Sequence, residues 1–149
     1  MLNLRARSVA SATLKAMTYD LIHLGQVLEF EGIADLNERL EDGRYLDDSE
    51  IEVICEGMGL QTSLLRRLND PKVSPMKRTS ILQNAPAVAN DTKHRRITTC
   101  VQYIDLVARI GEAQAKAHQR RERAARRLDM VEFFKSSRPT GRSSRVRNA

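Results

Sequence analysis

The stretch from Asp91 to Ile110, DTKHRRITTCVQYIDLVARI, repeats its apolar residues at the spacing of one buried helical face. Asp91 or Thr92 can accept hydrogen bonds from the amides of a first turn that have no helical partner, which predicts the start of a helix here. The predicted buried face consists of Ile97, Cys100, Val101, Ile104, Val107 and Ala108. The pattern therefore indicates a long helix with one side in the core.

The first turn of this helix is strongly basic, because it holds Lys93, His94, Arg95 and Arg96. A helix N-terminus already carries partial positive charge and unpaired amides, so added cations are unfavourable there unless an anion lies nearby. The turn fits docking against phosphates, and it fits a solvated basic surface equally well. Local sequence alone leaves both interpretations open.

The other periodic segments are also helical. A first helix is expected from Ser8 or Ser11 to about Glu29, with an apolar seam at Leu14, Met17, Leu21, Leu24 and Leu28. Further segments are expected at 33–40, at 47–59 with Asp48 or Ser49 as cap, at 60–68, and at 112–135 after a bend at Gly111. No stretch alternates like a strand. The predicted class is all-α, a small bundle of four to five helices.

Two segments lack this periodicity. Pro71, Pro75 and Pro86 predict an extended connector over 69–90, since proline interrupts a continuous helix. Residues 139–149 are basic and contain Gly and Ser, which predicts a flexible tail. We therefore expect one helical domain over 1–138, interrupted by the connector and followed by the tail.

Charge is distributed unevenly along the chain. The formal net charge is +6, but residues 1–90 hold 10 Lys/Arg and 13 Asp/Glu, whereas residues 91–149 hold 15 and 6. The basic C-terminal part, which includes Arg120, Arg121 and Arg123, favours a nucleic-acid partner. No apolar run approaches the ~20 residues of a membrane span, so no membrane association is expected.

The sequence shows no constellation typical of an enzyme. There is no phosphate-binding glycine loop, and no nucleophile has a base beside it. His23, His94 and His118 have no cysteine or acid at ligand spacing, and Cys55 and Cys100 are far apart. We expect no metal, cofactor, small-molecule substrate or catalytic activity, and reduced cysteines in a cytoplasmic protein.

Three segments carry a resemblance. Residues 8–33 read SVASATLKAMTYDLIHLGQVLEFEGI, residues 36–54 read LNERLEDGRYLDDSEIEVI, and residues 92–111 read TKHRRITTCVQYIDLVARIG. They resemble the opening helix, an acidic segment and the basic helix of the N-terminal core-binding (SAM-like) domain of the tyrosine recombinase, or phage integrase, family. The chain departs from the family in lacking tryptophan, which is common on the basic helix.

The resemblance implies a clamp on one side of duplex DNA. The positions that it implies face DNA are Ser11, Thr13, Lys15, Thr92, Lys93, Arg95, Arg96 and Thr99, to which the basic final helix adds Arg120, Arg121 and Arg123. The family cleaves DNA through a separate catalytic domain, with a His-x-x-Arg motif and a downstream tyrosine. His118 begins such a motif here, but all three tyrosines precede it.

The resulting expectation is a non-catalytic, nucleoid-associated DNA-binding module, either a truncated integrase or an accessory protein of a mobile element. Its further partners would be a full-length recombinase or a second copy, and 139–149 would be the remnant of an interdomain linker. The alternative is a protein–protein or oligomerisation module that uses helix 112–135. It assumes that Leu128, Val131 and Phe134 find no groove within so small a chain.

Overall fold

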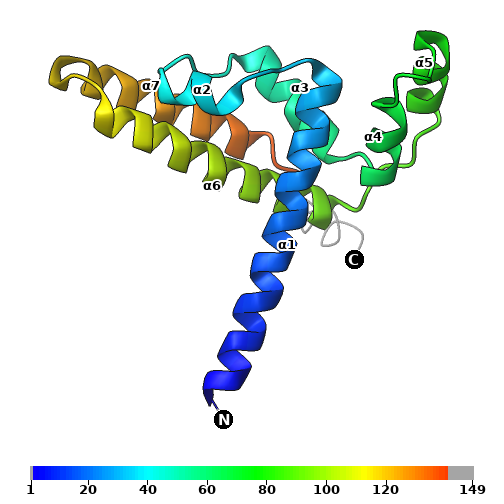
Figure 1. Cartoon of the computed structure of the whole chain (residues 1–149), viewed down its shortest axis with the longest axis horizontal. Coiled ribbons are helices and arrows are strands. Elements are labelled where there is room, and N and C mark those ends of the chain that lie inside the picture. The colour runs from blue at the N-terminus through cyan, green and yellow to red at the C-terminus, as the bar shows by residue number, and fades with distance from the viewer. Residues whose placement is uncertain (1, 141–149) are drawn as a thin grey trace.

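The computed structural model describes the backbone of residues 2–140 and the side chains of residues 11–140, which form seven helices and no strand (Figure 1). The predicted all-α class is confirmed, but the described residues form seven helices where four to five were predicted. The helices are α1 (Leu2–Glu31), α2 (Leu36–Glu41), α3 (Asp48–Met58), α4 (Thr62–Leu68), α5 (Pro75–Gln83), α6 (Asn90–Gln114) and α7 (Ala117–Ser136). No helix in the described chain combines the length and hydrophobicity of a membrane span.

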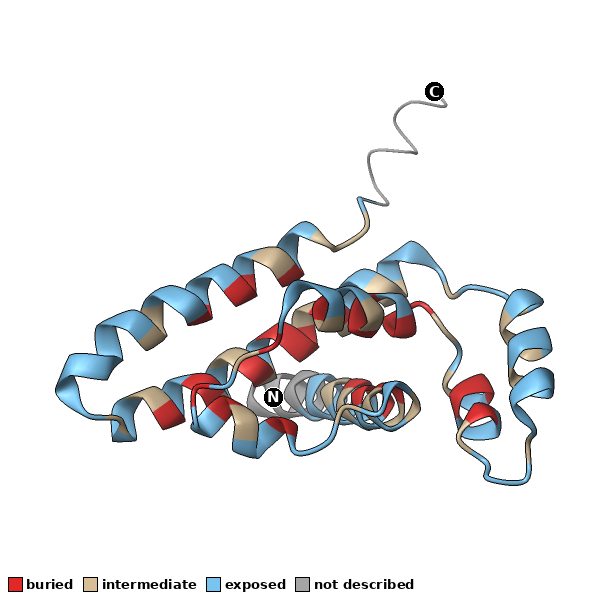
Figure 2. Ribbon diagram, turned by 90° about the horizontal axis from the view of Figure 1, so that it is seen from above, coloured by how far each residue is buried: buried red, intermediate tan, exposed pale blue. Residues whose placement is uncertain are grey.

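Three parts extend from a common centre. The N-terminal half of α1 projects away from the other helices, α6 and α7 form an antiparallel hairpin on one side, and α4 and α5 form an arm on the other (Figure 1). The core lies where the second half of α1 meets α3, α6 and the end of α7 (Figure 2). Its fully buried residues include Val27, Ile54, Ile97, Ile104 and Phe134. Each such side chain contributes about 1.5–3 kcal/mol of hydrophobic free energy.

The apolar seam predicted on α1 is only partly buried. Leu24 is buried, but Leu14 is 65% exposed, and Leu21 and Leu28 are half-buried. The α1 face that enters the core carries Asp20, His23, Leu24 and Val27 instead. Periodicity identified the helix, but it could not show that the other helices cover mainly its second half.

Three predicted helix starts are wrong. Helix α1 begins at Leu2, not at Ser8 or Ser11. At α3 the cap is Asp47, whose side chain accepts from the Glu50 amide while Glu50 accepts from the Asp47 amide, a complete capping box. At α6 the helix begins at Asn90 after Ala89, and no side chain caps it. The predicted caps of α3 and α6 lie within the first three residues of each helix, where the backbone is already helical.

The extended connector predicted over 69–90 is also wrong, because it contains α5. Ser74 caps this helix by accepting from the Lys77 amide, and Pro75 occupies the first helical position. Proline is tolerated there because the first-turn amide would have no helical acceptor. None of the residues of α5 is buried, so the helix stands at the outer end of the arm.

The end of the chain differs from the prediction at two points. Helix α6 runs straight through Gly111, and the turn into α7 lies at Ala115 and Lys116. Val131 and Phe134 are buried in the core, so the assumption that they find no groove within the chain is wrong. The sequence prediction of a flexible tail from residue 141 onward falls outside the described residues.

Candidate nucleic-acid interface

Because α6 begins at Asn90, the basic residues 93–96 lie in its second turn and not in its first. This turn lies against α1, where Asp20 supplies an anion. Arg95 Nη2 is 2.9 Å from Asp20 Oδ1, and Thr99 donates its hydroxyl to Asp20 Oδ2 at 3.0 Å. Asp20 is only 3% exposed. The carboxylate therefore compensates part of the positive charge at the N-terminus of α6.

Arg96 binds the end of α3. Its Nη1 donates to the carbonyl oxygens of Met58 at 3.0 Å and Leu60 at 2.8 Å. The last carbonyls of a helix have no helical amide to pair with and carry partial negative charge. A guanidinium supplies both the missing hydrogen-bond donor and a compensating positive charge. Burial lowers the pKa of Arg96, but an arginine side chain remains charged in proteins. Arg96 is therefore part of the fold.

His23 on α1 binds the same end of α3. Its Nε2 lies 2.9 Å from the Gly57 carbonyl, which can only accept, so Nε2 carries the proton. Nδ1 then accepts the Thr62 hydroxyl at 2.8 Å. The Arg96 guanidinium approaches Nε2 to 3.4 Å, but two donors face each other there. The imidazole is neutral, and burial is the main cause that lowers the pKa of His23.

We expect this histidine to make the fold less stable at mildly acidic pH. Above the unfolded pKa of about 6.5 both states are neutral, and as the pH falls below it the unfolded state binds a proton that the folded state resists. One such group lowers the unfolding free energy by at most about 1.4 kcal/mol per pH unit. Urea unfolding between neutral pH and about pH 5 measures this slope.

The matched variants are His23→Gln, which keeps an amide donor towards Gly57, and His94→Gln on the surface. The first is expected to flatten the pH dependence and the second to preserve it. An unchanged slope in His23→Gln would show that another group controls the acid sensitivity.

The residues predicted to face DNA fall into different environments. Ser11, Thr13 and Lys15 are exposed on the projecting half of α1. Thr92 and Lys93 are half-buried at the start of α6. Thr99 is 5% exposed and bonded to Asp20, so the prediction that it faces an external ligand is wrong: its helix position points into the α1–α6 contact.

The predicted arginines of α7 lie on the α6–α7 hairpin, away from the α1 half that projects (Figure 1). Arg120 donates to the carbonyl of Ala115 in the turn between α6 and α7, and Arg123 donates to the Glu41 carbonyl of α2. Arg121 is exposed and has no ion pair among the described residues. The predicted cations therefore do not form one continuous surface.

Arg127 in the same helix is almost fully buried. Its Nη1 is 2.7 Å from Asp105 Oδ1 and its Nε is 2.8 Å from Glu112 Oε2, so it ties α7 to α6. Arg127 belongs to the basic C-terminal part of the sequence, but its side chain forms an internal ion-pair network. The hairpin is correspondingly less basic on its outside than the sequence indicates.

A basic surface that the sequence analysis missed lies on the arm. Arg66 and Arg67 of α4, Lys72 of the turn and Lys77 of α5 are exposed, and none forms an ion pair within the described chain. Residues 60–90 contain five Lys/Arg and one Asp, but the acids of 29–56 hid this signal in the count over 1–90. We call these four residues the arm cations.

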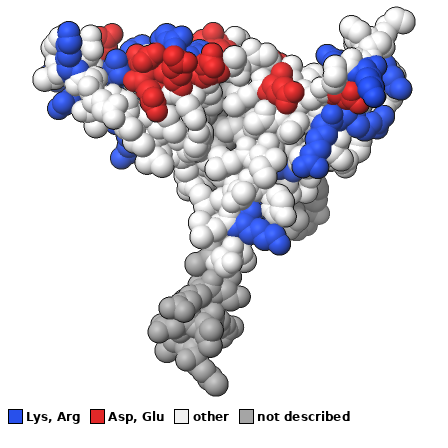
Figure 3. Space-filling model, in the orientation of Figure 1, with Lys and Arg blue, Asp and Glu red and all other residues white. Residues whose placement is uncertain are grey.

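Acidic residues gather at a different place. Figure 3 shows Asp and Glu concentrated along the upper edge, over α2 and α3, with Lys and Arg beside them towards the α6–α7 hairpin. Further Lys and Arg lie on the arm and on the described part of α1. The exposed acids of this edge include Glu38, Glu41, Asp42, Asp48 and Glu52. The edge over α2 and α3 is thus rich in acids, whereas the arm is rich in cations.

Comparisons of the chain with protein-family models, with characterised proteins and with solved structures gave no match. The resemblance to the core-binding domain of tyrosine recombinases therefore stays a prediction from sequence motifs.

Proposed function

We propose that the chain is a non-catalytic module that binds duplex DNA through the arm cations and the exposed half of α1. The observation that carries this proposal is the uneven distribution of charge. Four cations without an ion pair in the described chain gather on the α4–α5 arm, where residues 60–90 hold one acid, whereas residues 36–58 at the edge over α2 and α3 hold eight acids and two Lys/Arg. A polyanion is attracted to the first surface and repelled from the second. The geometry thus favours one orientation towards DNA.

On the projecting half of α1, Lys15 would contact a phosphate of the DNA. Ser11 and Thr13 would contribute hydroxyl contacts to the DNA backbone or to a base edge. At the start of α6, Lys93 can add charge. Arg95 contributes less, because a phosphate must compete with Asp20 for its guanidinium. Arg96 and Thr99 are not available for contacts with DNA, because their side chains form internal hydrogen bonds.

Within this proposal the chain acts as the core-binding half of a tyrosine recombinase, as an accessory protein or as a truncated integrase of a mobile element. Strand cleavage is not expected, because no tyrosine of the sequence follows His118. The alternative, association through 112–135, loses its main support, since Val131 and Phe134 are buried and only Leu128 remains 52% exposed.

Salt titration of duplex binding tests the proposal. Each lost phosphate contact flattens the log–log salt dependence by roughly 0.9. Replacing the four arm cations by alanine is therefore expected to flatten the slope by about two to four units. The matched variant replaces Lys116, Arg120 and Arg121 at the hairpin tip, with an expected change of about one unit or less.

Both sets are exposed, so stability is expected to change by no more than about 0.5 kcal/mol per substitution. Circular dichroism of each variant checks this. The arm variant could bind duplex DNA with an unaltered salt slope while the tip variant shows a flattened slope. In that case the hairpin is the DNA-binding element. If neither changes the slope, the proposal fails.

A further inference from the structure

One face of α1 is open along much of its length. Ser11, Leu14, Thr18, Leu21, Gly25 and Leu28 follow one another at intervals of three and four residues. Leu14, Thr18 and Gly25 are exposed, Leu21 and Leu28 are half-buried, and the flanking Ile22 is 43% exposed. This is the spacing of a helix that packs against another helix, but no described helix covers the first half of this face.

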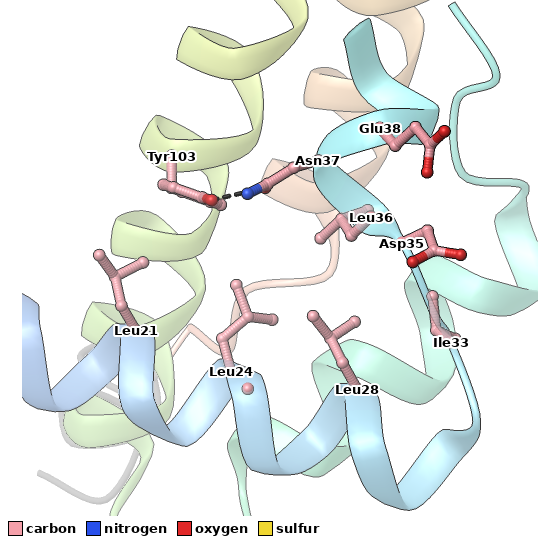
Figure 4. Close-up of a pocket in the computed structure, with 10 residues that line it drawn as sticks. Leu21, Leu24, Leu28, Ile33, Asp35, Leu36, Asn37, Glu38 and Tyr103 are labelled. Atoms are coloured by element: carbon pink, nitrogen blue, oxygen red, sulfur yellow. Dashed lines mark hydrogen bonds between the residues drawn. The ribbon is translucent and has the colours of Figure 1, made fainter. Parts of the chain in front are cut away.

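The second half of the same face forms the wall of a groove of about 550 Å³ between α1, α2 and α6 (Figure 4). Leu21, Leu24 and Leu28 point into it from α1, and Leu36 and Tyr103 close it from the other side. Tyr103 donates to the Asn37 side chain at 2.5 Å, which ties α6 to α2 behind the groove. The groove is apolar inside and has an acidic rim.

The acidic rim is formed by Asp35 and Glu38, which are exposed at the start of α2. Glu29 and Glu31 are exposed at the end of α1 nearby in sequence. In contrast, residues 2–19 of the sequence contain three cations, Lys15 among them, and no acid. The two halves of α1 therefore have opposite charge, and the basic first half is complementary to the acidic second half.

We propose that the occupant of this groove is the N-terminal half of α1 from a second copy of the chain, in a two-fold antiparallel contact centred near Ile22. Lys15 and Glu29 are each seven residues, or two turns, from Ile22 and lie on the same side of the helix. Antiparallel pairing about Ile22 therefore places Lys15 of each copy opposite Glu29 of the other. In the dimer Lys15 is then not available to a phosphate, and DNA binding depends on the arm cations. Two-fold symmetry forms this pair twice.

The apolar residues fit the same register. Leu14 of one copy reaches the end of the groove at Leu28 and Ile33 of the other, and Leu21 packs beside Gly25. A Cβ placed on Gly25 would meet no atom within 4 Å, so there is room for the partner's side chain. A parallel pair would instead bring Lys15 against Lys15 and leave Glu29 about 21 Å away along the axis.

The first test compares Leu14→Glu with Leu106→Glu by analytical ultracentrifugation of the full chain. Both leucines are exposed, 65% and 57%, so neither change is expected to disturb the fold. Only Leu14 lies on the proposed contact. We expect dimers of the unmodified chain, a dissociation constant raised about tenfold or more by Leu14→Glu, and no change from Leu106→Glu.

A charge exchange tests the register. Lys15→Glu and Glu29→Lys are each expected to weaken the dimer about fivefold, because two like-charge pairs replace two salt bridges. The double variant Lys15→Glu/Glu29→Lys is expected to restore the original dissociation constant. A chain that stays monomeric at on the order of 100 µM, or a double variant weaker than both single ones, overturns the proposal.

Discussion

Arg96→Ala is expected to lower the free energy of unfolding by about 2–4 kcal/mol, because it leaves two carbonyl oxygens at the end of α3 without their charged donor. Met58 is fully buried, so water does not reach its carbonyl in the folded chain. Neighbouring His23 cannot replace the guanidinium, since its one donor is already bonded to Gly57. Urea unfolding followed by circular dichroism measures the loss.

The control for this substitution is His94→Ala, two residues earlier in the same basic turn. His94 is exposed and its side chain has no described partner, so a change within about 0.5 kcal/mol is expected. Equal stability of the two variants would contradict the structural role of Arg96. The comparison also matters for DNA binding, because replacing Lys93, Arg95 and Arg96 together would confound lost contacts with partial unfolding.

Gly111→Ala is expected to destabilise the fold by about 2–3 kcal/mol, although alanine is the better helix former. A Cβ at this position would lie 2.5 Å from both the Cα and the carbonyl oxygen of Glu41 in α2. These are backbone atoms, so no side-chain rotation can relieve the overlap, and α2 must move away from α6. Leu36 and Leu40, which α2 buries in the core, would lose packing as a result.

Gly25→Ala is the matched control, since Gly25 is also inside a long helix but has open space around the added methyl group. It is expected to leave stability unchanged or to raise it by up to about 1 kcal/mol through helix propensity. Because Gly25 lies on the proposed dimer face, both variants are compared at a concentration where the chain is monomeric. If Gly111→Ala were as stable as Gly25→Ala, α2 could move away from α6 without a loss of unfolding free energy, and the close contact would not contribute to stability.

The sequence by itself determined the class of the fold and the buried face of α6. Ile97, Cys100, Val101, Ile104 and Ala108 are all buried, as their spacing predicts. Such a pattern depends on residues three and four apart, whose relative positions are fixed once the helix forms. The Val131 and Phe134 face of α7 was recognised for the same reason, although its partner in the core was not.

Only the tertiary structure decided which cations remain available to a ligand. Arg96 pairs with carbonyls 36 and 38 residues away in sequence, Arg95 with Asp20 at a separation of 75 residues, and Arg127 with two acids of the preceding helix. No local pattern encodes such pairs, because they depend on how helices cross. For the same reason the arm cations could be placed on one surface only once α4 and α5 were positioned in space. Arg66 and Arg67 lie in the predicted helix 60–68, and Lys72 and Lys77 lie in the segment 69–90 that its prolines made appear extended.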